Sequence, residues 1–477
     1  MLKLHNTLSK RKDAFRPLKE GVVTMYNCGL TVYDYATVGN LRAFTFADAL
    51  RRYLEYKGLE VRQVMNFTDV GHMFEDVDIG EDKMAAAAER EKKDPWAIAA
   101  FYIKAFLEDA REMGFEEPMV RPRATDHISE MIALVQRLID NGYAYVVNGS
   151  VYFDVSKFKD YGKLSGNTIE KLRTGAGGRV EPNSEKRNQF DFALWINDPK
   201  HIMNWKSPWC EKGYPGWHVE CSAMAIKYLG ESIDIHTGGV DNLFPHHENE
   251  IAQSEAATGK KFVSYWLHCE HLLVEGQRMG KSLGNYYTLK DLIVKSYDPK
   301  AVRYLLLSTH YRQQLNFTFE GLEAAKSTID RLKNLMYRLM DADGKGCGKE
   351  IKQLTEQVRK GFIKAMDDDL NVGDALAAIF EFVREVNNLI DGNMLSKEEA
   401  QEVYELMSGF DEVLGVIGEV KKEEKLPKEA EELIRKREEA RKAKDWKTAD
   451  QIRIQLRTMG IIIEDTPQGL RWRIEKR

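Results

Sequence analysis

Alternating strand and helix patterns in the first hundred residues constrain the fold more than any other feature of this chain. Residues 22–26 form an apolar run of strand length, residues 41–54 carry apolar side chains at helical spacing, and residues 61–67 supply a second apolar run. This order predicts a βαβ unit with two parallel strands. Folds built from such units bind ligands at the carboxyl ends of their strands. Cys28 and Gly29 are expected at that end of the first strand.

The alternation is interrupted and then resumes. Residues from about 119 to 204 contain a helix pattern, a hairpin strand at 151–155 and a glycine-rich loop, which together indicate an insertion. Two short apolar runs, at 233–236 and 262–268, are typical of further parallel strands. We therefore expect an α/β fold in which a Rossmann-type, doubly wound catalytic domain spans 1–297 and carries the insertion.

The remainder of the chain is predicted to be mainly helical. Apolar spacing indicates a helical region over 298–345 and a helix bundle over 346–420. Residues 421–477 hold 17 Lys and Arg against 12 Asp and Glu, a net charge of +5 on a chain of net charge -5. Two helices, the second capped by Asp445, and a terminal hairpin predict a small mixed α/β domain there. Its charge suits a polyanion, although helices rich in Lys and Glu are commonly only solvated surface.

The composition favours a folded cytoplasmic protein. Only 12 prolines accompany 43% hydrophobic residues, and residues 1–21 lack the apolar run of a signal peptide or membrane span. The cysteines are spaced too widely for a disulfide framework, which leaves free thiols or metal ligands. They are Cys28, Cys210, Cys221, Cys269 and Cys347.

Four of the side chains form a candidate zinc site. A helix that begins near Pro245 places His246 and Glu250 on one face, four residues apart. Together with Cys28 and Cys221 they supply two thiolates, an imidazole and a carboxylate, which are donors that zinc accepts. The alternative is that the cysteines are small buried hydrophobic residues and that the carboxylate only complements the positive end of the helix.

Three glycine-containing loops could bind a nucleotide. In residues 31–40, glycine would let phosphates approach backbone amides at a helix start. Residues 278–285 are basic and glycine-rich and would offer cations to a triphosphate. In residues 238–241, Asp241 could reach a ribose hydroxyl. Each loop taken alone could equally be an ordinary turn.

Taken together, these segments resemble the cysteinyl-tRNA synthetases, a family of class I aminoacyl-tRNA synthetases. The similarity covers almost the whole chain. Its blocks are Cys28 to Asp34, Ser207 to Trp209, Gly216 to Met224, Phe244 to Glu250, Asp369 to Asn371, Ala443 to Trp446 and Glu464 to Gly469. Residues 37–40 match the family's HIGH signature and residues 278–282 its KMSKS loop.

The resemblance implies ATP-dependent activation of cysteine, with Mg²⁺, and transfer of the cysteine to the terminal ribose of tRNA(Cys). It implies that the thiolate of cysteine completes the coordination of one zinc ion, that no editing domain is needed, and that the protein is a monomer. The implied roles are zinc ligation by Cys28, Cys221, His246 and Glu250; catalysis by Lys281, Ser282, Thr37 and Asn40; adenylate binding by Gly29, Thr31, Gly39, Gly239, Asp241 and Lys281; cysteine binding by Thr68 and Trp217; and anticodon binding by Arg441, Trp446, Arg471 and Arg473.

Both signatures depart from the family pattern. Thr37 stands in the place of the first histidine, and Gly280 replaces a hydroxyl side chain. His236 is a candidate to replace the missing cation. Two alternatives remain open: a ligase that passes cysteine to a small amine, as in the mycothiol pathway, and an inactive tRNA-binding paralogue. For Trp446 the alternative is the buried start of a helix rather than a base-stacking surface.

Overall fold

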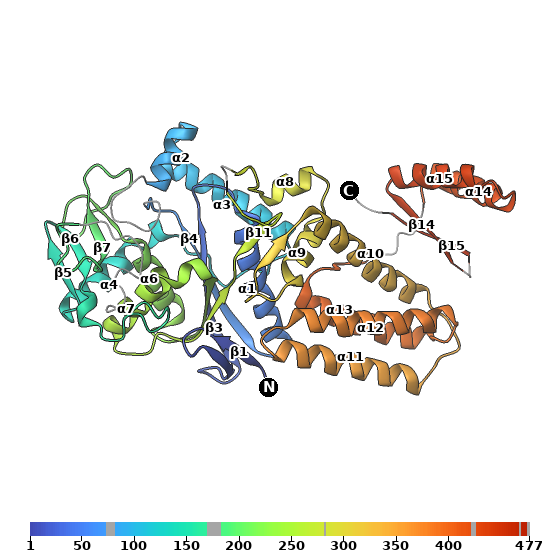
Figure 1. Cartoon of the computed structure of the whole chain (residues 1–477), viewed down its shortest axis with the longest axis horizontal. Helices are drawn as coiled ribbons and strands as arrows, with labels where there is room; N and C mark the ends of the chain where they lie inside the picture. The colour runs from blue at the N-terminus through green and yellow to red at the C-terminus, as the bar shows by residue number, and fades with distance from the viewer. Residues whose placement is uncertain (73–81, 169–182, 281–282, 421–425, 467–468, 475–477) are drawn as a thin grey trace. The chain divides into compact units, whose positions relative to one another are not determined.

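The computed structural model describes the chain except for residues 73–81, 169–182, 281–282, 421–425, 467–468 and 475–477 (Figure 1). It divides into two compact units. The first comprises residues 1–329, 359–379 and 410–416, and the second comprises 330–358, 380–409 and 417–477. Most of the boundaries between the units fall inside long helices. No helix among the described residues is both long enough and apolar enough to cross a membrane.

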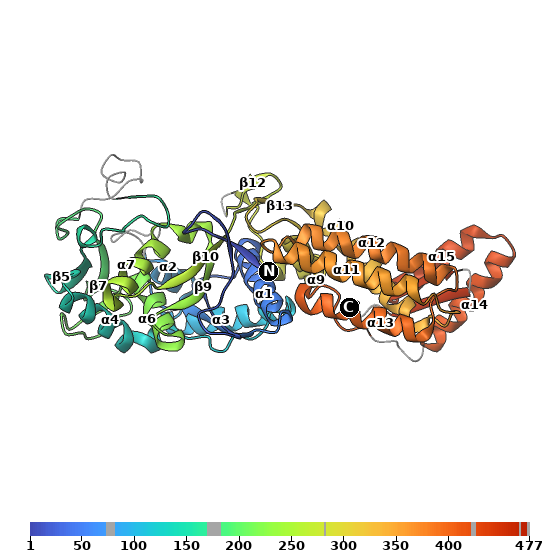
Figure 2. The ribbon, with the colours of Figure 1, turned by 90° about the horizontal axis from the view of Figure 1, so that it is seen from below.

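A four-stranded parallel sheet forms the centre of the first unit. Its strands are β3 (Val22–Thr31), β4 (Glu60–Thr68), β9 (Ile233–Gly239) and β10 (Val263–Cys269), in the order β10-β9-β3-β4. Helix α1 (Val38–Tyr56) covers one face, and helices α6 (Trp217–Leu229) and α7 (His246–Thr258) lie on the other (Figures 1 and 2). The expected Rossmann-type doubly wound sheet is therefore confirmed.

The first strand is longer than the sequence predicts. β3 continues past Tyr26, so Cys28 and Gly29 lie inside the strand rather than after it. A break in the register between Asn27 and Leu30 turns this part of the strand out of the regular ladder. A Cβ atom at Gly29 would lie 1.6 Å from the carbonyl oxygen of Asn66 on β4. Glycine is required here because the two backbones approach too closely for any side chain.

The insertion folds as a helix and a second sheet. Helix α4 (Ile128–Asp140) follows a 3₁₀ turn at Ala124–His127. The antiparallel strands are β5 (Ala144–Val147), β6 (Ser150–Phe153), β7 (Phe192–Asn197) and β8 (Gly213–Pro215). The strand predicted at 151–155 ends at Phe153, because Asp154 caps a 3₁₀ turn that begins at Val155. The last strand lies beyond residue 204, the predicted limit of the insertion.

The remaining elements of the first unit surround this framework. They are the hairpin β1 (Lys3–Asn6) and β2 (Arg11–Ala14), helices α2 (Lys83–Glu91), α3 (Pro95–Glu112), α8 (Leu289–Val294) and α9 (Pro299–Ser308), and the small sheet of β11 (Leu272–Val274), β12 (Gln277–Arg278) and β13 (Leu315–Phe317).

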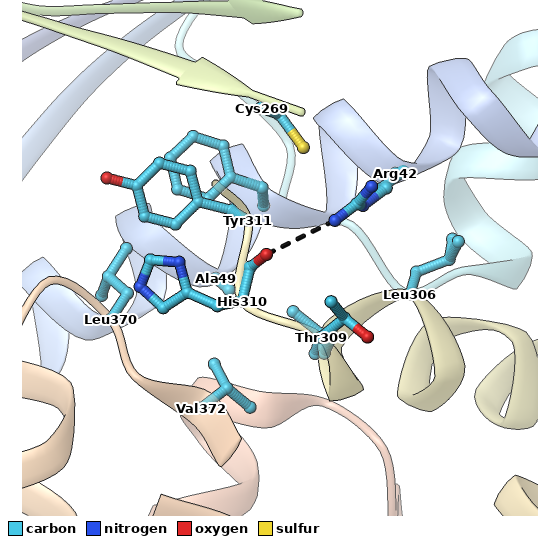
Figure 3. A pocket seen from close by; sticks show the side chains of 11 residues that line it. Arg42, Ala49, Cys269, Leu306, Thr309, His310, Tyr311, Leu370 and Val372 are labelled. Carbon is cyan, nitrogen blue, oxygen red and sulfur yellow. Dashed lines mark hydrogen bonds between the residues drawn. The ribbon is translucent and has the colours of Figure 1, made fainter. Parts of the chain in front are cut away.

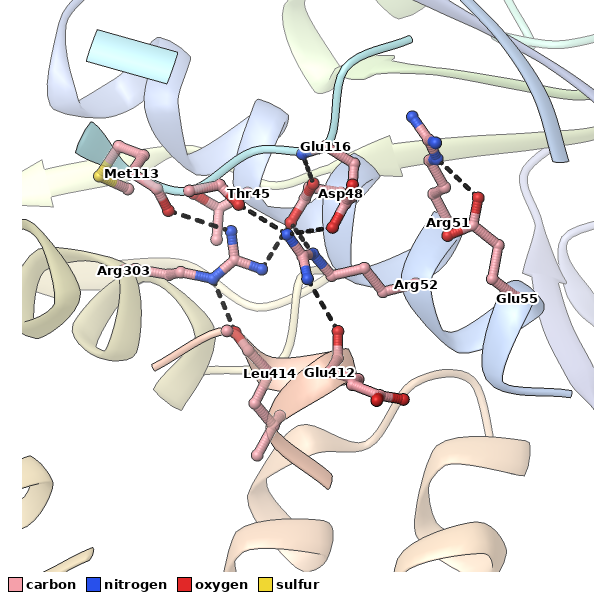
Figure 4. Close-up of polar contacts among 12 residues, drawn as sticks. Thr45, Asp48, Arg51, Arg52, Glu55, Met113, Glu116, Arg303, Glu412 and Leu414 are labelled. Atoms are coloured by element: carbon pink, nitrogen blue, oxygen red, sulfur yellow. Dashed lines mark hydrogen bonds and ion pairs between the residues drawn. The ribbon is translucent and has the colours of Figure 1, made fainter. Parts of the chain in front are cut away.

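A buried ion pair joins α1 to α9 (Figure 4). The Arg303 guanidinium lies 2.5 Å from the carboxylate of Asp48 and donates to the carbonyl of Leu414. Arg52 contacts the same carboxylate at 2.7 Å and donates to the carbonyl of Glu412. Burial raises the pKa of Asp48, but the two guanidinium groups outweigh it and hold that pKa below its usual value. The carboxylate therefore stays charged inside the unit.

The long helices are α10 (Phe319–Asp341), α11 (Lys349–Asp367), α12 (Val372–Asp391) and α13 (Lys397–Leu414), as the apolar spacing predicts. The C-terminal segment contains α14 (Lys428–Lys442), α15 (Trp446–Thr458) and the antiparallel hairpin β14 (Ile461–Thr466) and β15 (Gly469–Ile474). Asp445 caps α15, as predicted. A small apolar core holds this segment together; its buried members are Ala430, Ile452, Leu456, Ile461 and Ile463.

Candidate active site

Four side chains from three elements converge at the centre of the first unit. Cys28 lies on β3, Cys221 on α6, and His246 and Glu250 in the first turns of α7. Their ligand atoms all lie within 4.8 Å of one another. The Cys28 and Cys221 sulfurs are 3.8 Å apart, and His246 Nε2 lies 3.2 Å from Glu250 Oε1. The structure thus brings together the set that spacing suggested.

The chemistry of this cluster fits a metal ion better than a group of apolar residues. Burial raises the pKa of the Cys28 thiol, whereas the contact with Cys28 lowers the pKa of Cys221 to about 7. The Glu250 carboxylate is fully buried; burial raises its pKa, but His236 and His246 lower it to about 2. A buried carboxylate beside two thiols costs solvation free energy unless a cation compensates it. Two sulfurs, one imidazole and one carboxylate are a suitable donor set for zinc.

A second group of ligand atoms overlaps the first. Cys28 and Glu250 also converge with His236 and His247 within the same limit. His236 Nε2 lies 2.9 Å from Glu250 Oε2, and His247 Nε2 lies 3.3 Å from the Cys28 sulfur. His236 is fully buried and faces Glu250, so this placement does not support it as a replacement for the missing cation of the signature loop.

Further histidines continue the network behind these ligands. His268 lies 2.8 Å from His247, and its other ring nitrogen lies 2.8 Å from the Thr7 hydroxyl. His218 Nδ1 lies 2.8 Å from His246 Nδ1. Such outer contacts fix ring orientation in metal sites. His218, His247 and His268 could not be assigned from the sequence, because nothing in their spacing relates them to Cys28.

Thr68 is connected to the cluster by hydrogen bonds through the side chain of Asn66. The Asn66 side chain accepts a hydrogen bond from the Gly29 amide at 2.9 Å and donates one to the Thr68 hydroxyl at 3.2 Å. The Cys221 thiol donates to the same Asn66 oxygen at 3.8 Å. Thr31, at the end of β3, pairs with Thr68 across the sheet. Asn66 therefore orders this end of the sheet, and sequence reasoning missed it.

Trp217 is the first residue of α6, and its ring forms one border of the cluster. The ring centroid lies 4.6 Å from that of His246 and 6.2 Å from that of His72. The ammonium of Lys83 lies 4.9 Å from the centroid of the same ring. The two residues assigned to cysteine binding, Thr68 and Trp217, thus border the cluster from different elements.

The loop of residues 37–40 forms the start of α1. Thr37 caps the helix: its hydroxyl accepts from the Asn40 amide at 3.3 Å, and the Asn40 side chain accepts from the Thr37 amide at 3.0 Å. The methyl group of Met279 lies 3.2 Å from where a Cβ of Gly39 would be. The two signature loops are therefore adjacent. Lys281 and Ser282 lie outside the described residues.

The third loop lies at the carboxyl end of β9. Gly239 is the last residue of the strand, and Asp241 is an exposed residue of the 3₁₀ turn Val240–Leu243. The Asp241 carboxylate lies 3.4 Å from Nδ1 of His271, which follows β10. This carboxylate faces solvent at the strand ends, where nucleotides bind in doubly wound sheets.

A separate cavity of about 20 Å³ lies beneath α1 (Figure 3). Arg42, Cys269 and His310 are among the residues that line it. The Arg42 guanidinium donates to the carbonyls of Glu270, His271, His310 and Gln313. This volume holds about one water molecule. None of the site residues assigned above lines the cavity among the described residues, so it is a structural feature and not part of the site.

The C-terminal segment presents an exposed aromatic side chain. The Trp446 side chain is 58% exposed, so the interpretation as a buried helix start is wrong. The Arg441 guanidinium lies 5.9 Å from the Trp446 ring and forms an ion pair with Asp465. Arg471 and Arg473 belong to β15, and their side chains lie outside the described residues.

Three family models match the chain. Residues 14–327 match the class I (C) tRNA synthetase catalytic domain, residues 361–418 the DALR domain, and residues 423–473 the cysteinyl-tRNA ligase anticodon binding domain. Together they span most of the sequence, and the first alone covers more than half of it.

Curated relatives and solved structures agree with these matches. A cysteine–tRNA ligase of Caldicellulosiruptor saccharolyticus is 46% identical over 98% of both chains, and one of Bacillus licheniformis is 45% identical over 99% of both. The methionyl-tRNA synthetase of Mycobacterium tuberculosis, solved with methionyl-adenylate, superposes with a TM-score of 0.61 at 15% identity and covers 83% of this chain and 89% of that chain. This last likeness concerns the fold alone. On the strength of the matched catalytic domain and the full-length relatives, the chain belongs to the cysteinyl-tRNA ligases, a family of class I aminoacyl-tRNA synthetases.

Proposed function

We propose that this protein is a cysteine–tRNA ligase that activates L-cysteine with ATP and transfers it to the 3′-terminal ribose of tRNA(Cys). The observation that carries the proposal is the cluster of Cys28, Cys221, His246 and Glu250 at the core of a class I synthetase domain. A soft, thiol-reading site is what an enzyme needs to choose cysteine from amino acids of similar shape.

Cys28, Cys221, His246 and Glu250 are the residues that would hold one zinc ion. Bound there, zinc would supply a soft Lewis acid that prefers a thiolate to the hydroxyl of serine. Serine differs from cysteine by a single atom, and a pocket that measures only shape discriminates such pairs poorly. His218, His236 and His247 would keep the ligating side chains in orientation.

The other residues have proposed roles in binding and orienting the two substrates. Thr68 and Trp217 would border the bound cysteine. Gly29, Thr31, Gly39, Gly239 and Asp241 would contact the adenylate, and Asp241 would accept hydrogen bonds from the ribose. Thr37, Asn40, Lys281 and Ser282 would hold the phosphates of Mg-ATP, with Lys281 stabilising the charge that builds on the transferring phosphate.

Recognition of tRNA is proposed for the C-terminal part of the chain, from residue 298 onward. The proposed division is a catalytic domain over 1–297, a stem-contact helical region over 298–345, a helix bundle over 346–420 and an anticodon-binding domain over 421–477. Trp446 would stack on a base while Arg441, Arg471 and Arg473 contact phosphates or base edges. Because Arg441 already pairs with Asp465, its free capacity for an anionic partner is lower than its charge suggests.

One set of assays tests the proposal. Purified protein should catalyse cysteine-dependent ATP–pyrophosphate exchange and should charge a tRNA(Cys) transcript, and a strong chelator should abolish both activities until zinc is restored. Exchange without charging would indicate a ligase that uses a small amine acceptor. Binding of tRNA with neither activity would indicate an inactive paralogue. Sedimentation of the protein would test the expectation of a monomer.

A further inference from the structure

Lys83 holds a cation next to the proposed cysteine pocket. Its ammonium lies 4.9 Å from the centre of the Trp217 ring, and that ring centre lies 4.6 Å from the ring of His246. Lys83 is half-buried at the first position of α2. The ammonium therefore contacts a ring that itself contacts His246, a proposed zinc ligand.

Contacts on both sides fix the backbone at this position. The Lys83 amide donates to the carbonyl of His72 at 2.9 Å. The neighbouring Asp82 carboxylate caps α2 by accepting from the Ala85 amide at 2.6 Å, and it lies 3.0 Å from Nε2 of His201. The His201 ring in turn stacks on Tyr214 at 3.7 Å. These contacts therefore hold the backbone of Lys83 in place.

Gly71 lies too close to the Asp82 carboxylate for any residue with a side chain. A Cβ atom at Gly71 would lie 2.3 Å from the Asp82 carboxylate, so glycine permits the close contact. His72, the next residue, places Nε2 2.5 Å from the buried carboxylate of Glu220, three residues after Trp217. Lys83 is therefore connected through His72 and Glu220 to the first turn of α6, where Trp217 lies.

A cation at this place matches the chemistry of the substrate. Only two carbon atoms separate the sulfur of cysteine from its carboxyl carbon. If the sulfur lies at the cluster, the carboxylate must lie close by, where a positive charge can pair with it. The site also lacks the histidine that usually opens the signature loop. Thr37 stands in its place and is neutral, so it supplies no positive charge.

We propose that Lys83 binds the carboxylate of cysteine and then the α-phosphate of the cysteinyl-adenylate, with the Trp217 ring holding its alkyl chain and ammonium in place. This inference rests on the proposed function and adds a substrate-binding cation to it. It makes Lys83 a determinant of recognition of the carboxylate, which the thiol-reading cluster cannot provide.

Ligands with and without a carboxylate test this role directly. Cysteine, its methyl ester and cysteamine share the thiol and the amine, but only cysteine carries the negative charge. Calorimetric titration of the zinc-loaded, full-length protein should show that the wild type prefers cysteine to cysteamine by roughly 10-fold or more, the range of a charge-assisted hydrogen bond. Lys83→Met keeps the length of the side chain but removes its charge. In this variant the affinity for cysteine should fall until most of the preference is lost, while the affinity for cysteamine stays unchanged.

Matched variants separate this role from a structural one. Lys83→Arg should keep the preference for cysteine, and Lys92→Met, which removes an exposed charge at the end of the same helix, should behave as wild type. Zinc content and thermal midpoint should be the same in all variants. An equal loss of affinity for cysteine and cysteamine in Lys83→Met, or no loss for either, would overturn the inference. Failure of the wild type to bind cysteine would overturn the proposed function, and this inference with it.

Discussion

At the scale of single residues, Thr37 has a structural task that its position in the signature does not reveal. Its side chain and that of Asn40 satisfy each other's backbone amides at the start of α1. We expect Thr37→Ala to lower the free energy of unfolding by about 0.5–2 kcal/mol, because the first turn of α1 loses its cap. Thr37→Ser, which keeps the hydroxyl, should be close to wild type.

Urea unfolding followed by circular dichroism measures this difference. Thr288 forms the same kind of capping box with Asp291 on the short helix α8. Thr288 forms a backbone bridge with Thr37, however, so its cap belongs to the same place. The control for cap loss away from the proposed catalytic signature is Asp94→Ala, since Asp94 caps α3 by accepting from the Trp96 amide at 2.9 Å. If Thr37→Ala leaves the unfolding midpoint unchanged, the cap contributes nothing to stability and the residue is free for a purely chemical role.

The sequence reveals part of the candidate site and hides the rest for a physical reason. His246 and Glu250 could be paired because helical periodicity relates residues four apart. Asn66 and His268 could not be assigned, because they meet Cys221 and His247 only through packing of the sheet against α6 and α7. Periodicity reports neighbours along one element, whereas these contacts join different elements.

At the scale of elements, β3 shows why one predicted boundary is wrong. The apolar run ends at Tyr26, yet the strand continues to Thr31 because β4 still pairs with it after the register break. Backbone pairing extends a strand where side-chain pattern no longer signals one. The close approach at Gly29 is the cost of that extension.

We expect Gly29→Ala to destabilise the first unit strongly and to lower its zinc content. The added Cβ would lie 1.6 Å from the Asn66 carbonyl oxygen, so β3 and β4 must separate next to Cys28. Metal analysis and thermal unfolding of the purified variant measure both effects. Gly409→Ala is the matched control, since the same atom meets nothing within 4 Å on helix α13 and should be neutral or slightly stabilising. Normal zinc content and stability in Gly29→Ala would contradict this view of the strand.

The ion pair between α1 and α9 also acts at the scale of elements. Asp48→Asn should cost about 3–5 kcal/mol, because it leaves the fully buried Arg303 without its counter-ion. The folded pKa of Asp48 lies below its unfolded value of about 3.9. The pair therefore contributes fully at neutral pH, and its contribution is lost as the pH falls below about 4.

Unfolding of wild type and Asp48→Asn across a pH series tests the sign of this effect. The gap in stability should be widest near pH 7 and should narrow in acid. The exposed pair of Arg62 and Glu60 supplies a control, since Glu60→Gln should change stability by no more than about 1 kcal/mol. A gap that does not depend on pH would mean that the asparagine side chain fails for reasons of shape rather than charge.

At the scale of the whole molecule, the sequence predicts the order of elements better than the links between them. The βαβ unit, the long helices and the terminal hairpin all follow from periodicity. The role of Arg42 does not follow from periodicity. Its guanidinium donates to the carbonyls of residues 270, 271, 310 and 313, and each of these residues lies more than two hundred positions from Arg42 in the chain. A buried guanidinium leaves no periodic trace in the sequence.

The exposed Trp446 allows recognition of tRNA to be separated from activation of the amino acid. Stacking of a base on an aromatic ring contributes roughly 1–3 kcal/mol. Trp446→Ala should therefore raise the KM for tRNA by roughly 5- to 150-fold and leave cysteine-dependent ATP–pyrophosphate exchange unchanged. Ile454→Ala removes another exposed apolar side chain from α15, so it controls for loss of surface area alone. A fall in pyrophosphate exchange with Trp446→Ala would show that this side chain acts beyond docking of tRNA, and an unchanged KM would remove it from the binding surface.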